Sequence, residues 1–367
     1  MQKRILVIAS IVDIAPAKYL VQEFKKLGCE ILVVSDQDYE NVDIVATKAV
    51  DIERICKKRN FRPEIILFVE GGNMNIFPTN LESFQCVKLW WGIDTHNDYE
   101  KHLLISRLFD HSFIAQKDFV SMLQKDGIDS ISWFPLATPV TDSGITTSNR
   151  KFDISYVGSQ NWELYPERKK LIDLIKKNYK NIFVGSASAS EMMQIYRDAK
   201  IVLNFSLKND INMRVFEATG AGALLLTNEI KGNGINDLLE SKKDYDTYSS
   251  SEDLLTKIDY YLNNETQRSE IATSGYKRII TSHKYSDRAK EILYYNPAKI
   301  ISHPVSIFDT GAVLTMFNFY PDALNLFVKV AKKSQKGKRS QLLILILQFI
   351  TLPFFLILKS VEKLLSK

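Results

Sequence analysis

Arg214 and Glu217 are the two residues in this sequence whose types and spacing best suit a chemical task. They stand three positions apart in a predicted short helix, so their side chains share one helix face. An arginine at the start of a helix suits a diphosphate, and a carboxylate one turn later suits sugar hydroxyls. The two residues therefore predict a binding site for a nucleotide-activated molecule. The alternative is an exposed ion pair between the two side chains.

The ends of the same helix carry further candidates. Asn212 precedes the helix, where a side-chain oxygen can cap free amides, and it is also a candidate for ligand binding. Gly220 and Gly222 follow at the other end, where glycine stops a helix and lets the backbone pass close to a ligand. A helix stop and a tight turn would account for both glycines without a ligand.

Asp94 and His96 follow an apolar run at 85–91 that predicts a buried strand. Loops that leave the carboxyl ends of parallel strands carry the functional groups of doubly wound sheets. Either side chain could act as a general base on a hydroxyl group, and the pattern does not decide between them. Capping of the helix predicted next is the alternative for each residue.

Weaker candidates also follow predicted strands. They are Gly71, Gly72, Asn73, Gly158, Ser159, Arg168 and Gly185. The first three would line the side of the site that faces the acceptor molecule, or form a plain turn. The amides at 158 and 159 would face phosphate, with Arg168 either reaching it or lying on a solvated basic face. Gly185 would leave room for a stacked nucleobase.

Apolar runs alternate with amphipathic stretches along both halves of the chain, which indicates two parallel, doubly wound sheets. Strands are predicted at 5–9, 30–35, 64–69, 85–91 and 111–115, and again at 152–159, 181–184 and 201–205. The sequence predicts a first domain at 1–140, a linker at 141–151 and a second domain at 152–298. A helical extension similar to one tetratricopeptide unit follows at 299–335, and a basic, apolar tail at 336–367.

The composition narrows the class of protein. Hydrophobic residues make up 45% of the 367 residues and charged residues 25%, which is ordinary for a globular protein. Much of the net charge of +5 comes from the C-terminal region, and aromatic residues do not alternate with basic ones, so a nucleic-acid partner is not expected. Cys29, Cys56 and Cys86 are odd in number, lie far apart and have no metal-binding spacing, so we expect a reducing, cytoplasmic location.

The C-terminal run 342–358 is apolar apart from Gln348, Thr351 and Pro353, and lysines flank it on both sides. It lies at the lower length limit for a bilayer span. The tail at 336–367 is therefore predicted to associate with a membrane surface, as an embedded or peripheral anchor with a basic collar. A helix that packs on the body of the protein is the alternative.

The segment 204–227, which contains Arg214 and Glu217, resembles the core of the CgeB-type, glycosyltransferase family-1-like domain. Similar stretches lie upstream at 91–96, 133–137 and 153–159, and downstream at 248–288. The resemblance implies a GT-B fold of class α/β, in which two Rossmann-like doubly wound domains face each other across a cleft. This chain adds a C-terminal helical tail to that fold.

The resemblance also implies an activity. In such enzymes a sugar passes from a nucleotide-sugar donor, held mainly by the second half, to a hydroxyl acceptor. It places Arg214 at the diphosphate and Glu217 at the ribose, and implies that neither a metal nor another bound cofactor is required. Many retaining members carry a second glutamate eight residues earlier, where this chain has Asn209. The stereochemical outcome therefore stays open.

The sequence thus predicts a cytoplasmic glycosyltransferase held at the membrane by its tail. That location suggests a membrane-linked glycan or a cell-surface polysaccharide precursor as the acceptor. One alternative is a non-catalytic, nucleotide-sugar-binding scaffold of a membrane glycan-assembly complex, which Asn209 keeps open. Another is a nucleotide-sugar epimerase with the same fold.

Overall fold

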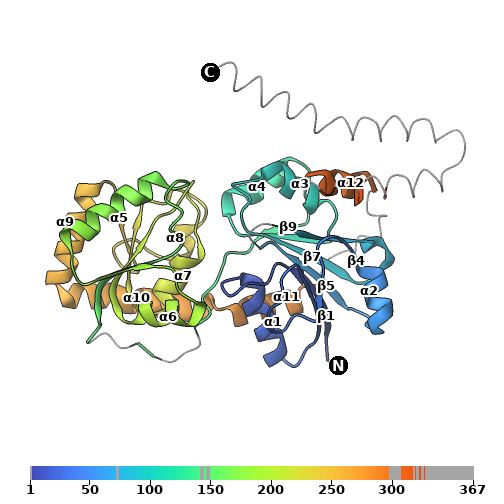
Figure 1. Cartoon of the computed structure of the whole chain (residues 1–367), viewed down its shortest axis with the longest axis horizontal. Helices are drawn as coiled ribbons and strands as arrows, with labels where there is room; N and C mark the ends of the chain where they lie inside the picture. The colour runs from blue at the N-terminus through green and yellow to red at the C-terminus, as the bar shows by residue number, and fades with distance from the viewer. Residues whose placement is uncertain are drawn as a thin grey trace, which may run out of the picture.

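The computed structural model describes residues 2–71, 74–140, 144–145, 149–296, 307–316, 319, 322–323 and 326. Two α/β halves lie side by side along the long axis of the molecule (Figure 1). Each half is built around one parallel sheet, so the two doubly wound sheets predicted from the sequence are present.

The first half contains a seven-stranded sheet in the order β3-β2-β1-β5-β7-β8-β9. Its strands are β1 (Arg4–Ala9), β2 (Glu30–Ser35), β3 (Ile44–Val45), β5 (Ile65–Val69), β7 (Val87–Gly92), β8 (His111–Ile114) and β9 (Ile131–Trp133). Apolar clusters cover both faces of the sheet, which explains why the central strands are apolar along their length. The chain winds outward from β1 on one side and from β5 on the other, so a crevice opens at their carboxyl ends.

Helices and a small second sheet flank these strands. They are α1 (Pro16–Lys26), α2 (Ile52–Arg59), α3 (Tyr99–Ser106), α4 (Lys117–Lys125), the short strands β4 (Lys48–Asp51) and β6 (Ile76–Thr79), and the 3-10 turn η1 (Leu81–Ser83). The sequence analysis did not predict the pairing of β4 with β6. Helix α1 turns Leu20, Val21 and Phe24 toward the sheet, where they are fully or almost fully buried.

The second half contains a five-stranded sheet in the order β11-β10-β12-β13-β14. Its strands are β10 (Phe152–Val157), β11 (Ile182–Gly185), β12 (Ala199–Asn204), β13 (Leu224–Asn228) and β14 (Asp246–Tyr248). Its helices are α5 (Pro166–Asn178), α6 (Ala189–Arg197), α7 (Met213–Gly220), α8 (Ile235–Leu238), α9 (Ser251–Asn263) and α10 (Glu265–Ser282). The strand order reverses between β10 and β12, which places the ligand crevice of this half at the loops after those two strands.

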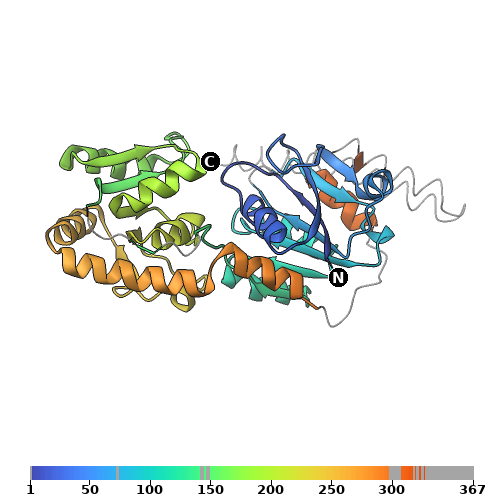
Figure 2. The ribbon, with the colours of Figure 1, turned by 90° about the horizontal axis from the view of Figure 1, so that it is seen from below.

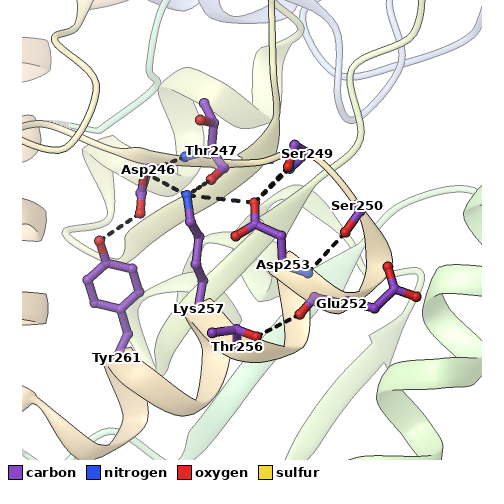
Figure 3. Close-up of polar contacts among 9 residues, drawn as sticks. All are labelled: Asp246, Thr247, Ser249, Ser250, Glu252, Asp253, Thr256, Lys257 and Tyr261. Atoms are coloured by element: carbon purple, nitrogen blue, oxygen red, sulfur yellow. Dashed lines mark hydrogen bonds and ion pairs between the residues drawn. The ribbon is translucent and has the colours of Figure 1, made fainter.

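Polar contacts fix the start of α9 beside the edge strand β14 (Figure 3). The Ser250 hydroxyl oxygen accepts from the amide of Asp253 at 3.1 Å, as a helix cap does. The Lys257 ammonium lies 3.4 Å from the Asp246 carboxylate and 3.9 Å from that of Asp253. Tyr261 donates to Asp246 at 2.8 Å. These groups satisfy one another, so we assign the cluster a structural role.

Helix α11 (Tyr285–Tyr294) connects the two halves. Figure 2 shows α10 and α11 running in succession beneath the second half and onto the first. Helix α11 packs against α1, with the rings of Tyr19 and Tyr285 centred 4.9 Å apart. The backbone amide of Thr138 donates to the carbonyl of His283 at 2.9 Å. The predicted second domain therefore ends in a helix that packs on the first half.

Helix α12 (Ile307–Met316) packs against α3, and its Val313 and Leu314 join an apolar cluster of the first half. The described part of the extension at 299–335 thus lies against the body. The second helix predicted there falls largely outside the described residues, and the tail at 336–367 falls wholly outside them. Within the described part of the chain, no helix has both the length and the apolar character needed to cross a bilayer.

Candidate functional site

A cavity of about 340 Å³ lies at the point where the strand order of the second sheet reverses. Six of the predicted site residues line it: Gly158, Ser159, Arg168, Asn212, Arg214 and Glu217. Ile14 of the first half also lines it, so the cavity lies between the two halves. Next to Ile14, the Asp13 carboxylate accepts from the amide of Ala189 at the start of α6, at 2.5 Å, and holds the halves together.

The guanidinium group of Arg214 is fixed at the base of this cavity. Its Nη2 donates to the carbonyl of Val157 at 2.7 Å, and its Nη1 donates to Asn204 Oδ1 at 2.9 Å. The group also lies over the ring of Tyr156, 4.6 Å from the ring centre. Each terminal nitrogen carries a second N–H, so this fixed group can still donate to an anion in the cavity.

Glu217 lies one helical turn further on and is only 3% exposed. Its Oε1 atom is buried without a hydrogen-bond partner, and among the described residues no ion pair joins it to Arg214. Burial raises the pKa of Glu217 to about 7, against the opposing charge of Arg214. The alternative of an exposed ion pair is therefore wrong. An unpartnered carboxyl group at a cavity wall suits a ligand hydroxyl, which would supply the missing hydrogen bond.

The start of α7 differs from the predicted cap. Asn212 stands at the N-cap position, but its side chain makes no capping hydrogen bond, and its Oδ1 is buried without a partner. The side chain of Asn209 instead accepts from the amide of Lys231 at 3.0 Å. The start of α7, where Asn212 and Met213 line the cavity, therefore has no side-chain cap, as in a helix start that binds an anion.

Gly158 and Arg168 frame the opposite wall. A Cβ atom at Gly158 would lie 2.6 Å from Arg214 Nη2 and 2.9 Å from the Tyr156 hydroxyl, so only glycine leaves room for the fixed guanidinium. Arg168 stacks over Tyr165 at 4.2 Å, and its Nε is buried without a partner. Although the neighbouring Lys169 is exposed, Arg168 itself lines the cavity rather than a solvated face.

Two of the residues predicted to bind the nucleotide-activated molecule, Gly220 and Gly185, lie outside the cavity lining. Gly220 is still within α7, and a Cβ atom there would collide with Thr138 Oγ1 at the connection between the halves. Its role is close packing, and the prediction that it approaches the ligand is not met. Gly185 ends β11, where its carbonyl accepts from the amide of Gly158 at 3.0 Å. The following residues, Ser186 and Ala187, line the cavity in its place.

Asp94 and His96 meet a carboxylate from the other half. Asp94, His96 and Asp210 each place one side-chain nitrogen or oxygen atom within 4.8 Å of those of the other two. Asp210 belongs to the loop after β12, so this cluster spans the cleft between the halves. Gln116 of the first half donates to Asp210 Oδ1 at 2.9 Å and holds it there. Two carboxyl groups and an imidazole at this spacing can share a proton or surround a small cation.

Burial sets the protonation of this cluster. It raises the pKa of Asp94 to about 6, and the charges of Glu70 and Asp210 act in the same direction. Burial also raises the pKa of Asp210 to about 6, although the hydrogen bond from Gln116 acts to lower it. Burial lowers the pKa of His96. A carboxylate whose pKa lies near neutrality is suited to general base catalysis.

Neither Asp94 nor His96 caps the next helix. Helix α3 begins at Tyr99, its N-cap residue is Asp98, and His96 Nδ1 is buried without a partner. The capping alternative is therefore wrong for both residues. Their side chains are left available for an acceptor group at the cleft.

Two site carboxylates escaped the sequence analysis. Asp210 lies just before α7, and the left-handed backbone of Lys208 and Asn209 turns it toward the first half. Glu70 accepts from the amides of Ile93 and Asp94. Its position directly after the apolar strand β5 is the signal that could have identified it.

The predicted acceptor side is described only in part. A Cβ atom at Gly71 would lie 2.8 Å from the carbonyl oxygen of Ser10, so this glycine permits close packing against the end of β1. Gly72 and Asn73 lie outside the described residues. Their contribution to an acceptor site stays a prediction.

Comparison with known proteins bears on the fold and on the second half of the chain. Residues 145–294 match the model of a family described as glycosyl transferase-like. A glycosyltransferase from Rickettsia africae has a similar structure, with a TM-score of 0.54 and 14% identity over 80% of this chain and 100% of that one. HepE from Anabaena, solved with UDP-glucose, gives a TM-score of 0.55 and 11% identity over 79% and 98% of the two chains.

Sucrose-phosphate synthase from Thermosynechococcus elongatus is similar too, with a TM-score of 0.53 and 11% identity over 79% of this chain and 97% of that one. No curated protein matches the chain in sequence. At these identities the structural likeness establishes the fold, and the family match covers the half that contains the cavity. The chain therefore has a GT-B fold, and most of its second half matches the glycosyl transferase-like family.

Proposed function

We propose that this protein transfers a sugar from a nucleotide-sugar donor to a hydroxyl acceptor. One observation carries the proposal: the fixed guanidinium of Arg214 and the buried, unpartnered carboxyl group of Glu217 line one cavity of the glycosyltransferase-like half. A subtype close to the CgeB-type proteins, suggested by the segment 204–227, is part of this proposal.

The donor would lie with its diphosphate between Arg214 and the uncapped start of α7. These groups would stabilise the charge that develops on the departing diphosphate, so no metal is needed in this scheme. Glu217 would accept hydrogen bonds from the ribose hydroxyls. UDP-sugars are the first donors to test, because HepE was solved with UDP-glucose.

On the other side of the cleft, Asp94 or His96 would take the proton from the acceptor hydroxyl as it attacks the anomeric carbon. Contact between the halves, such as that of Asp13 with Ala189, would exclude water that would otherwise hydrolyse the donor. The anomeric outcome follows from the face on which the acceptor binds, and Asn209 leaves it open.

The acceptor in this proposal is a membrane-linked glycan or a cell-surface polysaccharide precursor. Its support is the basic, apolar composition of the tail at 336–367, which would keep the enzyme at the cytoplasmic face of a membrane. Flotation of the full chain with anionic and neutral lipid vesicles tests this part separately from the chemistry.

Thermal unfolding of the full chain with UDP, GDP, dTDP, ADP and CMP, and with their sugars, tests the donor site. A ligand at a hundred times its dissociation constant should add about 2.7 kcal/mol of stability. We expect a shift with one nucleotide class and its loss in Glu217→Ala. No shift with any nucleotide would contradict the donor site. Binding without turnover would favour the scaffold, and conversion of the donor without an acceptor would favour the epimerase.

A further inference from the structure

Glu70 lies directly beneath the loop that carries Asp94 and His96. It follows β5, is only 4% exposed, and reaches the loop after the neighbouring strand β7. Its Oε2 accepts from the amide of Ile93 at 2.5 Å and from that of Asp94 at 2.8 Å. Both hydrogen bonds go to a charged acceptor away from solvent, where such bonds are strong.

The other oxygen of Glu70 connects to the helix that follows the loop. Glu70 Oε1 lies 3.1 Å from His102 Nε2, and His102 Nδ1 lies 2.9 Å from Thr95 Oγ1. His102 and Thr95 are fully buried, and Trp90 packs edge-on against the imidazole. A single carboxylate therefore holds the loop backbone directly and holds the Thr95 side chain through His102.

This arrangement requires Gly92 at the start of the loop. A Cβ atom there would lie 2.9 Å from His102 Nδ1 and 2.9 Å from the Trp90 ring. Although burial alone would raise it, the pKa of Glu70 is lowered by His102 and by the two amide donors. The Glu70 side chain is thus held as a fully partnered anion, and none of its hydrogen bonds involves a residue that lines the cavity.

We infer that Glu70 is a positioning residue, which acts through His102 and Thr95 to fix the loop so that Asp94 and His96 face Asp210 across the cleft. This inference rests on the proposed function for its effect on turnover. The anchoring of the loop can be tested without turnover.

The chain offers a matched control in Asp110. It is also a buried carboxylate of the first half, accepts from the amide of Lys88 at 2.7 Å, and lies 3.7 Å from the Lys88 ammonium. It precedes β8, so it lies at the amino edge of the sheet, away from the cleft. Asp110→Ala removes the same kinds of contact as Glu70→Ala without touching the loop.

The test compares Glu70→Ala, Glu70→Gln and Asp110→Ala in the full chain. Amide hydrogen exchange at Ile93 and Asp94 reports anchoring, and release of UDP from UDP-glucose reports turnover. We expect Glu70→Ala to speed exchange at both amides and to lower kcat about 100-fold with little change in donor KM, because small misplacements of catalytic groups cost that much. Asp110→Ala should lower the melting temperature comparably and leave kcat nearly unchanged.

Glu70→Gln should restore both readouts. Its oxygen can still accept from the two amides, and its amide group can donate to His102 Nε2 if the imidazole changes tautomer. If Glu70→Gln kept both amides protected from exchange but had a kcat as low as that of Glu70→Ala, the positioning role would be overturned. Glu70 would then act through its charge. Unchanged exchange in Glu70→Ala would overturn the positioning role outright.

Two further outcomes separate the inference from the proposed function. If the wild-type chain releases no UDP while Glu70→Ala speeds exchange, the loop anchor stands and the proposed activity with this donor fails. If Glu70→Ala does not fold, Thr95→Val replaces it, because valine has the same shape and removes only the His102 contact. Thr95→Val should then lower kcat by a smaller factor, and an unchanged kcat would count against the inference.

Discussion

On the side of the cavity formed by the second half, three polar atoms have no partner among the described residues, on Arg168, Asn212 and Glu217. The loop of Asp94 and His96 in the first half is instead held by a fully partnered carboxylate, Glu70. Buried polar groups without partners cost stability, so a protein keeps them where a ligand supplies the missing hydrogen bonds. A partnered anchor holds its loop in one geometry whether or not a ligand is bound. The difference fits the proposed roles: the second half binds the donor, and in the first half Glu70 positions a loop in which His96 Nδ1, buried without a partner, is left for the reaction.

Asp94→Asn should have the largest effect on turnover and leave binding intact. Loss of a general base typically lowers kcat by about 100- to 10,000-fold. Donor affinity should not change, because the cavity residues belong almost entirely to the second half. Steady-state kinetics and nucleotide titration measure the two quantities. His96→Gln is the companion variant, and the larger loss of kcat identifies the base. If both variants kept the wild-type kcat, the first half would have no catalytic role.

Glu217→Ala should have the opposite pattern, with weaker binding as its primary effect. Hydrogen bonds to charged groups contribute about 1.5–3 kcal/mol each, so the donor dissociation constant should rise about 10- to 100-fold. Calorimetric titration with UDP measures it. Glu252→Ala on α9 is the control, because this exposed carboxylate does not line the cavity. Equal affinities in the two variants would rule out Glu217 as a ligand contact.

The sequence predicted what depends on local pattern. Apolar runs of strand length identified β1, β2, β5, β7 and β8 of the first sheet and β10, β11 and β12 of the second. The spacing of Arg214 and Glu217 placed them on one face of α7. It could not predict Glu70 with His102, which are 32 positions apart and meet only because β5 and β7 are neighbours in the sheet. Nor could it predict that Asp210 crosses the cleft, because this depends on left-handed backbone at the two preceding residues.

Gly220→Ala should separate packing from binding within α7. The added Cβ would collide with Thr138, and overpacking of this kind costs about 1–3 kcal/mol. UDP affinity should stay the same, because Gly220 does not line the cavity. Gly185→Ala is the control, since its Cβ would meet only the Phe183 ring, at 3.3 Å. If Gly220→Ala weakened UDP binding without lowering the melting temperature, the original prediction of ligand contact would be restored.

Glu217→Gln tests the same carboxyl group without ligand, through the pH dependence of stability. Burial raises the pKa of Glu217 from the ordinary value of 4.5 to about 7. Between these values the folded chain binds more protons than the unfolded chain, so this group makes the wild type less stable as pH rises. Glutamine does not titrate. The melting temperature of Glu217→Gln relative to wild type should therefore increase from pH 4.5 to pH 7 and level off above it. A constant difference would mean that the carboxyl group has a partner in the free protein, and the contrast between the two sides of the cleft would be lost.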